Sequence, residues 1–136
     1  MAARPREARP LEVSVRFRPG VAIIDMHGEI DATGEEVLNA AYAQASSRSP
    51  DTILLNFGDV PFMDTTGIAL IVGLLAQARK VRRRLLVYGL SDHYVEIFHI
   101  TRLADFMRIF PDEPSALAGA PAPESALPRG SDGDLA

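Results

Sequence analysis

The feature that most constrains the fold is an alternation of strand-like and helix-like segments. Residues Ile53–Phe57 form a continuous apolar run with the length of a strand covered on both faces. The segment Ile68–Ala78, which follows closely, is apolar nearly all round at helical spacing and ends in Arg79 and Lys80. Such a segment predicts a helix that is packed rather than exposed. A strand followed by a packed helix is typical of an α/β domain with a mostly parallel sheet.

The other segments extend this pattern in both directions. Leu11–Phe17 alternates apolar and polar residues, and a turn separates it from the β-branched run Val21–Met26, so a hairpin is expected. A helix capped by Thr33, with Glu36 three residues later, should follow. Three elements are expected after the apolar helix, namely a strand at Leu85–Tyr88, a short helix carrying Val95, Ile97 and Phe98, and a strand at Phe106–Phe110 before a last helical turn. The predicted fold is a single α/β domain with a mixed, mostly parallel sheet flanked by helices, in the order ββαβαβαβα.

Composition divides the 136 residues into one domain and two ends. Residues 1–10 are predicted to be a flexible basic lead, residues 11–118 the ordered domain, and residues 119–136, rich in Ala, Pro, Gly, Ser and Asp, a disordered tail. Hydrophobic residues make up 47% of the chain, enough to bury a core. The lack of cysteine fits a cytoplasmic protein. No segment approaches the run of about 20 apolar residues that crosses a bilayer, so a soluble protein without membrane insertion is expected.

Several kinds of chemistry find no support in the sequence. A net charge of -4 argues against a nucleic-acid partner. The three histidines lack metal-ligand spacing, and no glycine-rich phosphate-binding or dinucleotide-binding motif is present. Asp25, Glu29 and Asp31 are interpreted as solvated or partner-facing carboxylates rather than metal ligands. The sequence therefore predicts no metal site, no cofactor and no enzymatic activity.

An acid and two hydroxyls stand where the apolar helix should begin, within Val60–Gly67. The first amides of a helix lack internal partners and carry the positive end of its dipole, so a hydroxyl held there is well placed to carry a phosphoryl group. A simpler interpretation is that Asp64 or Thr65 only caps the helix. The acidic segment Gly28–Asp31 follows the second strand. Because functional groups gather beyond the carboxyl ends of parallel strands, both segments are expected at one edge of the sheet.

These two segments carry a resemblance to a known family. Phe62–Ile68 resembles the Asp-Ser-Ser/Thr-Gly-Leu phosphorylation motif of STAS domains, in particular of the bacterial anti-sigma factor antagonists. Gly28–Asp31 is similar to that family's Gly-Glu-Leu/Ile-Asp segment, and the similarity extends from Val13 to about Leu117. The chain departs from the usual pattern at Thr65, where Ser is most common, and at Ala69, where a second Gly is common. With both motifs present, a phosphorylation switch is favoured over a cap alone.

The resemblance implies a partner-switching role in the control of transcription. In this family the unphosphorylated antagonist binds an anti-sigma factor that is also a serine/threonine kinase, and the sigma factor is released. Phosphorylation ends this binding, and a serine/threonine phosphatase restores it. The implied phosphoacceptor is Thr65. The resemblance also implies that Asp31 and Asp64 contribute to kinase recognition, with Thr66 as a flanking hydroxyl. The residue types themselves predict that Gly67 lets a kinase approach the backbone closely and that the apolar residues Pro61, Phe62, Met63 and Ile68 form part of the partner-binding surface.

Three questions stay open at the level of sequence. The chain resembles STAS domains in general, so an unphosphorylated subunit that regulates a transporter or a lipid-transport complex is an alternative, as is a receiver-like domain in which Asp64 takes the phosphoryl group. The basic cluster Arg79–Arg84 is interpreted as a solvated cluster that favours the helix C-terminus, or as a surface for an acidic partner. Neither the oligomeric state, including a homodimer, nor the sigma factor and its stimulus can be assigned from these residues.

Overall fold

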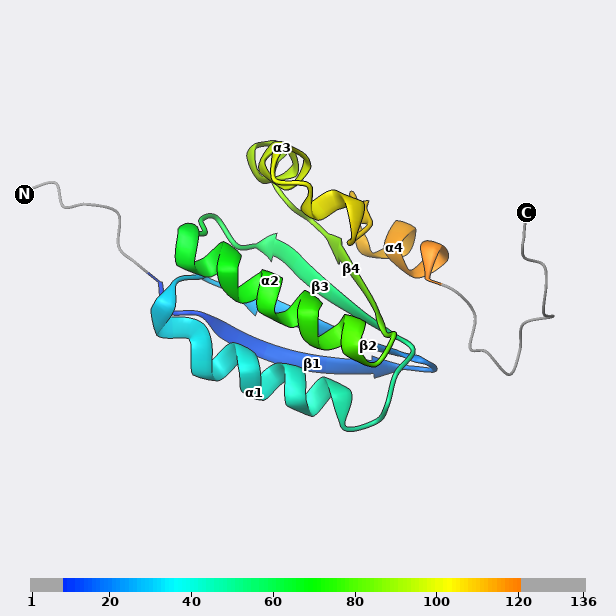
Figure 1. Ribbon diagram of the computed structural model, residues 1–136. Coiled ribbons are helices and arrows are strands. Elements are labelled where there is room, and N and C mark those ends of the chain that lie inside the picture. The colour runs from blue at the N-terminus through cyan, green and yellow to red at the C-terminus, as the bar shows by residue number, and fades with distance from the viewer. Residues whose placement is uncertain (1–8, 121–136) are drawn as a thin grey trace, which may run out of the picture.

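The computed structural model describes residues 9–120, so the predicted basic lead and C-terminal tail lie almost entirely outside the described residues. Its centre is a five-stranded sheet in the order β1-β2-β3-β4-β5 (Figure 1). The strands are β1 (Glu12–Arg18), β2 (Val21–His27), β3 (Thr52–Asp59), β4 (Arg84–Tyr88) and β5 (Ile109–Phe110). β1 and β2 form an antiparallel hairpin, and all other neighbouring strands are parallel. The predicted mixed, mostly parallel sheet is confirmed.

Four α-helices connect or follow these strands within residues 9–120. They are α1 (Glu35–Ser46), α2 (Thr65–Lys80), α3 (Asp92–Ile100) and α4 (Glu113–Gly119), joined by the short 3-10 helices η1 (Ala32–Gly34) and η2 (Leu103–Asp105). Figure 1 shows α1 and α2 running along the same side of the sheet. Apart from the 3-10 turns, the order is ββαβαβαβα, as predicted. None of the helices between residues 9 and 120 combines the length and the hydropathy needed to cross a membrane.

The two faces of the sheet bury separate apolar clusters, because successive strand residues point to opposite sides. On the face covered by α1 and α2, Phe57 of β3 packs edge-on against Phe98 of α3, with ring centroids 6.2 Å apart. On the opposite face, Leu54 of β3 packs in a smaller cluster with Ala116 of α4. β3 is the central strand, and Leu54 and Leu55 are both fully buried. This arrangement confirms that its continuous apolar run belongs to a strand covered on both faces.

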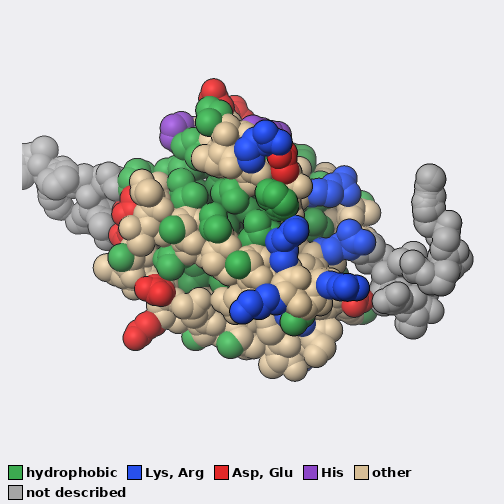
Figure 2. Space-filling view, in the orientation of Figure 1, with side chains coloured by type: hydrophobic (Ala, Val, Ile, Leu, Met, Phe, Trp, Pro, Cys, Tyr) green, Lys and Arg blue, Asp and Glu red, His purple; other side chains and the backbone are tan. Residues whose placement is uncertain are grey.

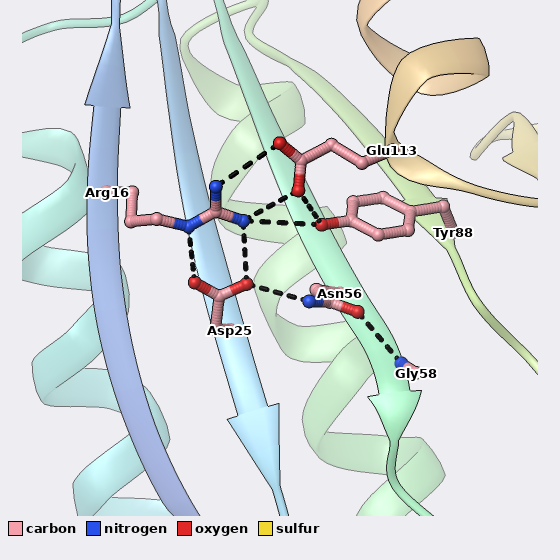
Figure 3. A network of polar contacts seen from close by, with 6 residues as sticks. All are labelled: Arg16, Asp25, Asn56, Gly58, Tyr88 and Glu113. Atoms are coloured by element: carbon pink, nitrogen blue, oxygen red, sulfur yellow. Dashed lines mark hydrogen bonds and ion pairs between the residues drawn. The ribbon is translucent and has the colours of Figure 1, made fainter.

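A network of polar contacts crosses the sheet beneath α4 (Figure 3). The Arg16 guanidinium donates to both carboxylate oxygens of Asp25, at 2.6 and 2.9 Å, and to Glu113 of α4 at 2.7 Å. Asn56 donates to Asp25 at 2.7 Å, and the Tyr88 hydroxyl donates to Glu113 at 2.6 Å. Only 9% of Asp25 is exposed. The interpretation of Asp25 as a solvated or partner-facing carboxylate is therefore wrong, because Arg16 supplies a counter-charge inside the fold.

The network changes the acidity of its members. Burial raises the pKa of Asp25, but hydrogen bonds from Arg16 and Asn56 outweigh this effect and hold the pKa below its usual range. The hydrogen bond from Arg16, followed by that from Tyr88, lowers the pKa of Glu113. Burial, followed by the hydrogen bond to Glu113, raises the pKa of the Tyr88 phenol. Both carboxylates are thus charged near neutral pH, and Arg16 links the edge strand β1 to α4.

The predicted cap at Thr33 is wrong. Asp31 caps the η1 turn instead, because its carboxylate accepts from the Thr33 amide at 3.0 Å and from the Thr33 hydroxyl at 2.6 Å. The Thr33 hydroxyl is thus turned toward Asp31, and no amide of the described residues donates to it. α1 begins at Glu35, one residue later than expected, with Gly34 as an N-cap that has no side-chain hydrogen bond. Glu29 is also buried, whereas Asp31 is partly exposed.

The predicted strand Phe106–Phe110 is shorter than expected. Only Ile109 and Phe110 pair with β4, and the residues before them form the η2 turn, in which the Phe106 amide donates to the Leu103 carbonyl at 2.9 Å. Phe106 is 53% exposed. Its aromatic character suggested a strand, but the turn places the ring on the surface beside the end of α2.

Candidate functional site

The junction at residues 60–67 lies between β3 and α2, at the carboxyl edge of the parallel strands. Asp64 is the N-cap of α2, and its Oδ1 accepts a hydrogen bond from the Gly67 amide at 2.8 Å. This bond satisfies one of the amides that have no partner inside the helix, which explains why α2 begins at the next residue. The capping interpretation is therefore confirmed for Asp64.

Thr65 and Thr66 form the first turn of α2, and both side chains are exposed. Within residues 9–120, neither hydroxyl is engaged in a hydrogen bond. The surrounding helix amides contribute a partial positive charge that favours an anionic group at this end. The Thr65 oxygen is therefore reachable from outside, as a phosphoacceptor must be.

The two motif segments are physically joined, as their positions in the sequence led us to expect. Ile30 and Met63 form a parallel bridge beyond the main strands. The Ile30 amide donates to the Phe62 carbonyl at 3.1 Å, and the Asp64 amide donates to the Ile30 carbonyl at 3.3 Å. Asp31, which follows Ile30, is thereby held next to the segment that starts α2. The structure thus brings the acidic segment and the threonine-bearing segment to one edge of the sheet.

Gly67 and Met63 face inward, which corrects the role expected for them. A Cβ atom at Gly67 would lie only 1.9 Å from the Ile30 carbonyl oxygen, so glycine is required here for close packing inside the protein rather than for the approach of a kinase. Met63 is 3% exposed and belongs to the core, so it cannot form part of a docking surface. Phe62, which is 36% exposed, and Ile68, which is partly exposed, remain at the surface.

Tyr94 of α3 supports the site, a role that no sequence pattern indicates. Its hydroxyl accepts from the Met63 amide at 2.9 Å and donates to the Met63 carbonyl at 3.0 Å. The phenol is buried, so both bonds are shielded from water. A tyrosine in a short amphipathic helix looks like any core residue, and its partner lies 31 residues away, so no local pattern could reveal the contact.

A shallow groove of about 250 Å³ opens beside this junction, between the ends of β3 and β4. At its rim His27 Nδ1 lies 2.9 Å from an Asp59 carboxylate oxygen, and Arg9 lies 3.5 Å from the other oxygen. The hydrogen bond with His27 lowers the pKa of Asp59. No group of side chains among residues 9–120 is arranged to hold a metal ion.

The outer side of α2 differs from the all-round packing that its sequence predicted. Ala69, Gly73 and Ala76 are exposed, and Val72 is 42% exposed. Residues spaced by three and four positions share one side of a helix, so these four form a single stripe that begins next to Thr66. We call these four residues the α2 stripe. The helix sequence is apolar on this side although the domain itself does not cover it, which is typical of a surface that meets a partner.

The α/β domain thus presents an exposed pair of hydroxyls and an uncovered apolar helix stripe at one edge. The sequence matches the STAS domain family over residues 12–116, which is most of the chain. The protein therefore belongs to the STAS domain family.

Several similar proteins are anti-sigma factor antagonists by name. The anti-sigma-B factor antagonist of Listeria monocytogenes is 30% identical over 82 residues, which cover 60% of this chain and 72% of that protein. The solved structure of an anti-sigma factor antagonist from Mycobacterium paratuberculosis matches with a TM-score of 0.70 at 20% identity, covering 80% of this chain and 92% of that one. The Bacillus cell fate determinant SpoIIAA in its phosphorylated form gives a TM-score of 0.63 at 22% identity, covering 80% and 100%. At these identities the two structures establish the shared fold.

Proposed function

We propose that the protein is an anti-sigma factor antagonist whose binding is switched by phosphorylation of Thr65. Unphosphorylated, it binds an anti-sigma factor that is also a serine/threonine kinase, and a sigma factor is released. Phosphorylation ends this binding, and a serine/threonine phosphatase reverses the modification. The observation that carries the proposal is the exposed Thr65 hydroxyl at the start of a helix capped by Asp64, in a STAS domain whose relatives bear this function in their names.

The local charges account for a switch that alters binding and spares the fold. A phosphate adds about -1.5 to -2 charges, and the N-terminus of α2 tolerates it because the helix dipole is positive there. Asp64 and Asp31 already make this edge acidic. The added charge therefore builds an anionic patch on the surface that a partner must approach, and a partner that accepts the neutral threonine is repelled.

The partner surface of this proposal combines the exposed residues of the motif with the α2 stripe. Phe62 and Ile68 supply apolar contacts, and Asp31, Asp64 and Thr66 supply a polar rim. Gly67 and Met63 act from inside, by holding α2 against Ile30 and by bonding to Tyr94. The domain is then the substrate of a kinase rather than an enzyme itself, and it acts in the cytoplasm together with the sigma factor.

The first test separates the two adjacent hydroxyls. Thr65→Ala and Thr66→Ala are incubated with ATP and with the anti-sigma kinase that co-purifies with the Thr65→Ala protein. Intact-mass analysis should find one phosphoryl group on the parent protein and on Thr66→Ala, and none on Thr65→Ala. The phosphate should survive acid, because a threonine phosphate is an ester. Loss of the group in acid would assign it to Asp64, and an unmodified parent protein would favour the subunit of a transporter or lipid-transport complex.

The second test addresses binding alone. Thr65→Ala should bind the kinase as tightly as the unmodified parent. Thr65→Glu should bind at least about tenfold more weakly, because a charge beside Asp64 and Asp31 must lose its water when the partner covers it. Thr66→Glu adds the same charge one position further on and serves as the matched comparison. Equal affinity of Thr65→Glu and Thr65→Ala would show that negative charge at this position is not the signal.

A further inference from the structure

A basic groove lies at the opposite end of α2 from Thr65. Its volume is about 450 Å³. The residues that line it are Leu75, Arg79, Arg82, Arg83, Arg84, Leu85, Leu86, Phe106 and Arg108. Fourteen residues separate Thr65 from Arg79, which corresponds to about 21 Å along the helix. Figure 2 shows Lys and Arg side chains gathered on this side of the molecule, next to an area of hydrophobic side chains. We call this hollow the basic groove, and none of its lining residues belongs to the phosphorylation motif at residues 60–67.

The fold accounts for only part of this charge. Arg79 and Lys80 lie in the last turn of α2, where cations favour the helix dipole. Arg83 donates to the Pro50 carbonyl at 2.8 Å and to Ser46 Oγ at 3.1 Å, so it ties the end of α2 to the segment before β3. These roles explain the basic residues nearest to the helix. Three other arginines line the groove, and one of them, Arg108, lies over the Phe110 ring at 5.0 Å.

Those three arginines are Arg82, Arg84 and Arg108, which are all exposed. None of them forms an ion pair with another residue of the described range 9–120. The whole chain carries a net charge of -4, so this positive charge is local rather than a general property of the protein. These positive charges have no acidic partner within the described residues, so they can pair with acidic groups of another molecule.

Arg82 also stands in an unfavourable backbone position. Its φ is 59°, and it follows the C-cap of α2, with its amide donating to the Arg79 carbonyl at 3.1 Å and the Arg83 amide donating to the Ala78 carbonyl at 2.8 Å. This is the Schellman geometry, in which glycine is the favoured residue because it has no Cβ. The backbone therefore does not explain why residue 82 is an arginine, whereas a ligand bound by its side chain would explain it.

An exposed aromatic ring completes the groove. Phe106 is 53% exposed, and the Arg79 guanidinium lies 4.9 Å from the centre of its ring. An adjoining apolar depression is lined by Val72, Leu75 and Ala76, so the groove continues into the α2 stripe. Arginine and aromatic residues side by side are typical of protein-protein interfaces, and stacking holds the guanidinium in place before a partner arrives.

We propose that the basic groove binds an acidic amphipathic segment of a partner protein. Its carboxylates pair with Arg82, Arg84 and Arg108, because the guanidinium fork matches a carboxylate. Its apolar side chains rest on the exposed Phe106 ring. The concave shape and the apolar lining favour a protein segment over a nucleic acid, whose phosphates need an extended basic track, and over a lipid surface, which needs a broad apolar face. The proposal does not depend on phosphorylation of Thr65.

The test uses a fluorescent peptide in which glutamates and leucines repeat at helical spacing, added to the full chain and followed by fluorescence anisotropy. The parent protein should bind it, and binding should weaken as salt rises. Arg82→Gly should weaken binding about tenfold, with no loss of thermal stability, because glycine suits the left-handed backbone. Arg84→Gln and Phe106→Ser should also weaken it. Arg18→Gln removes the same charge from an exposed arginine outside the groove and should leave binding unchanged.

Each of the following results would overturn the proposal. The glutamine version of the peptide could bind as well as the glutamate version, or Arg82→Gly could bind like the parent. A single-stranded DNA oligonucleotide or vesicles of anionic phospholipid could bind more tightly than the peptide, with the same dependence on Arg82, which would assign the groove to those ligands. Self-association of the parent that Arg82→Gly abolishes, seen by sedimentation, would assign it to a second copy of this chain.

Discussion

Gly67→Ala should lower the free energy of unfolding by about 3 kcal/mol or more, because the added methyl would meet a fixed backbone oxygen. Its Cβ would lie 1.9 Å from the carbonyl oxygen of Ile30. That carbonyl accepts the Asp64 amide at 3.3 Å, and Ile30 is bridged to Met63. If α2 moved away from Ile30 to make room for the methyl group, the segments Gly28–Asp31 and Val60–Gly67 would separate. Urea denaturation followed by circular dichroism measures the change.

Gly73→Ala is the matched control, since it makes the same substitution two turns further along the same helix. A Cβ at Gly73 would meet nothing within 4 Å. Alanine is favoured over glycine inside a helix, so this variant should be more stable by about 1 kcal/mol. The urea midpoint should fall in Gly67→Ala and rise in Gly73→Ala. If both midpoints moved in the same direction, the contact with Ile30 would not be the reason that residue 67 is glycine. Gly73 lies in the α2 stripe, so weaker partner binding by the more stable variant would also place the partner there.

The kinds of elements and their order could be predicted because periodicity reports which faces are buried. The alternation in Leu11–Phe17 predicted a strand with one face toward the core, and the apolar run Ile53–Phe57 predicted a central strand. The structure confirms both, since Val13, Val15 and Phe17 pack against the core and β3 is the middle strand. Periodicity failed at Phe106, where an aromatic residue is used on the surface. It also overstated the packing of α2, because an apolar side chain that stays at the surface looks the same in sequence as one that meets the core.

The motif could be placed from the sequence, but the internal contacts that support it could not. A helix start after β3 and an exposed Thr65 follow from local residue types, and the structure has both. Modification of Thr65 stays a prediction. The contacts of Gly67 with Ile30 and of Tyr94 with Met63 join segments about thirty residues apart. Whether a glycine faces a kinase or a neighbouring carbonyl depends on such tertiary contacts, and one sequence does not contain them.

The polar network of Arg16, Asp25 and Glu113 beneath α4 also joins segments that are far apart in the sequence. Arg16→Met should lower the free energy of unfolding at neutral pH by about 2 kcal/mol, because it leaves the carboxylates of Asp25 and Glu113 without their cation. Removing one member of a fully buried pair costs about 3–5 kcal/mol. The Arg16 side chain is 37% exposed, and water screens the charges, so a smaller value is expected. Methionine keeps the apolar stem, which isolates the effect of the charge.

The dependence on pH tests the cause. In the parent, the pKa values of Asp25 and Glu113 lie below their usual range, so the unfolded chain binds more protons in moderate acid. The stability that these groups contribute is complete above their ordinary pKa values of about 4 and is lost as pH falls through the lowered ones. In Arg16→Met, the carboxylates of Asp25 and Glu113 stay at least partly buried without a cation beside them. Protonation removes their negative charge and therefore lowers the cost of burying them. The difference in stability between parent and variant should therefore shrink from pH 7 toward pH 3.

Arg102→Met provides the comparison for an exposed pair. Arg102 contacts Asp105 at 2.6 Å, but its side chain is 78% exposed, so its loss should change stability by less than about 1 kcal/mol. If the defect of Arg16→Met instead grew on acidification, the guanidinium could not be the group that keeps the two carboxylates charged. α4 would then be held on the sheet by its apolar contacts alone, with Ala116 and Leu117 packed on β4 and its neighbours.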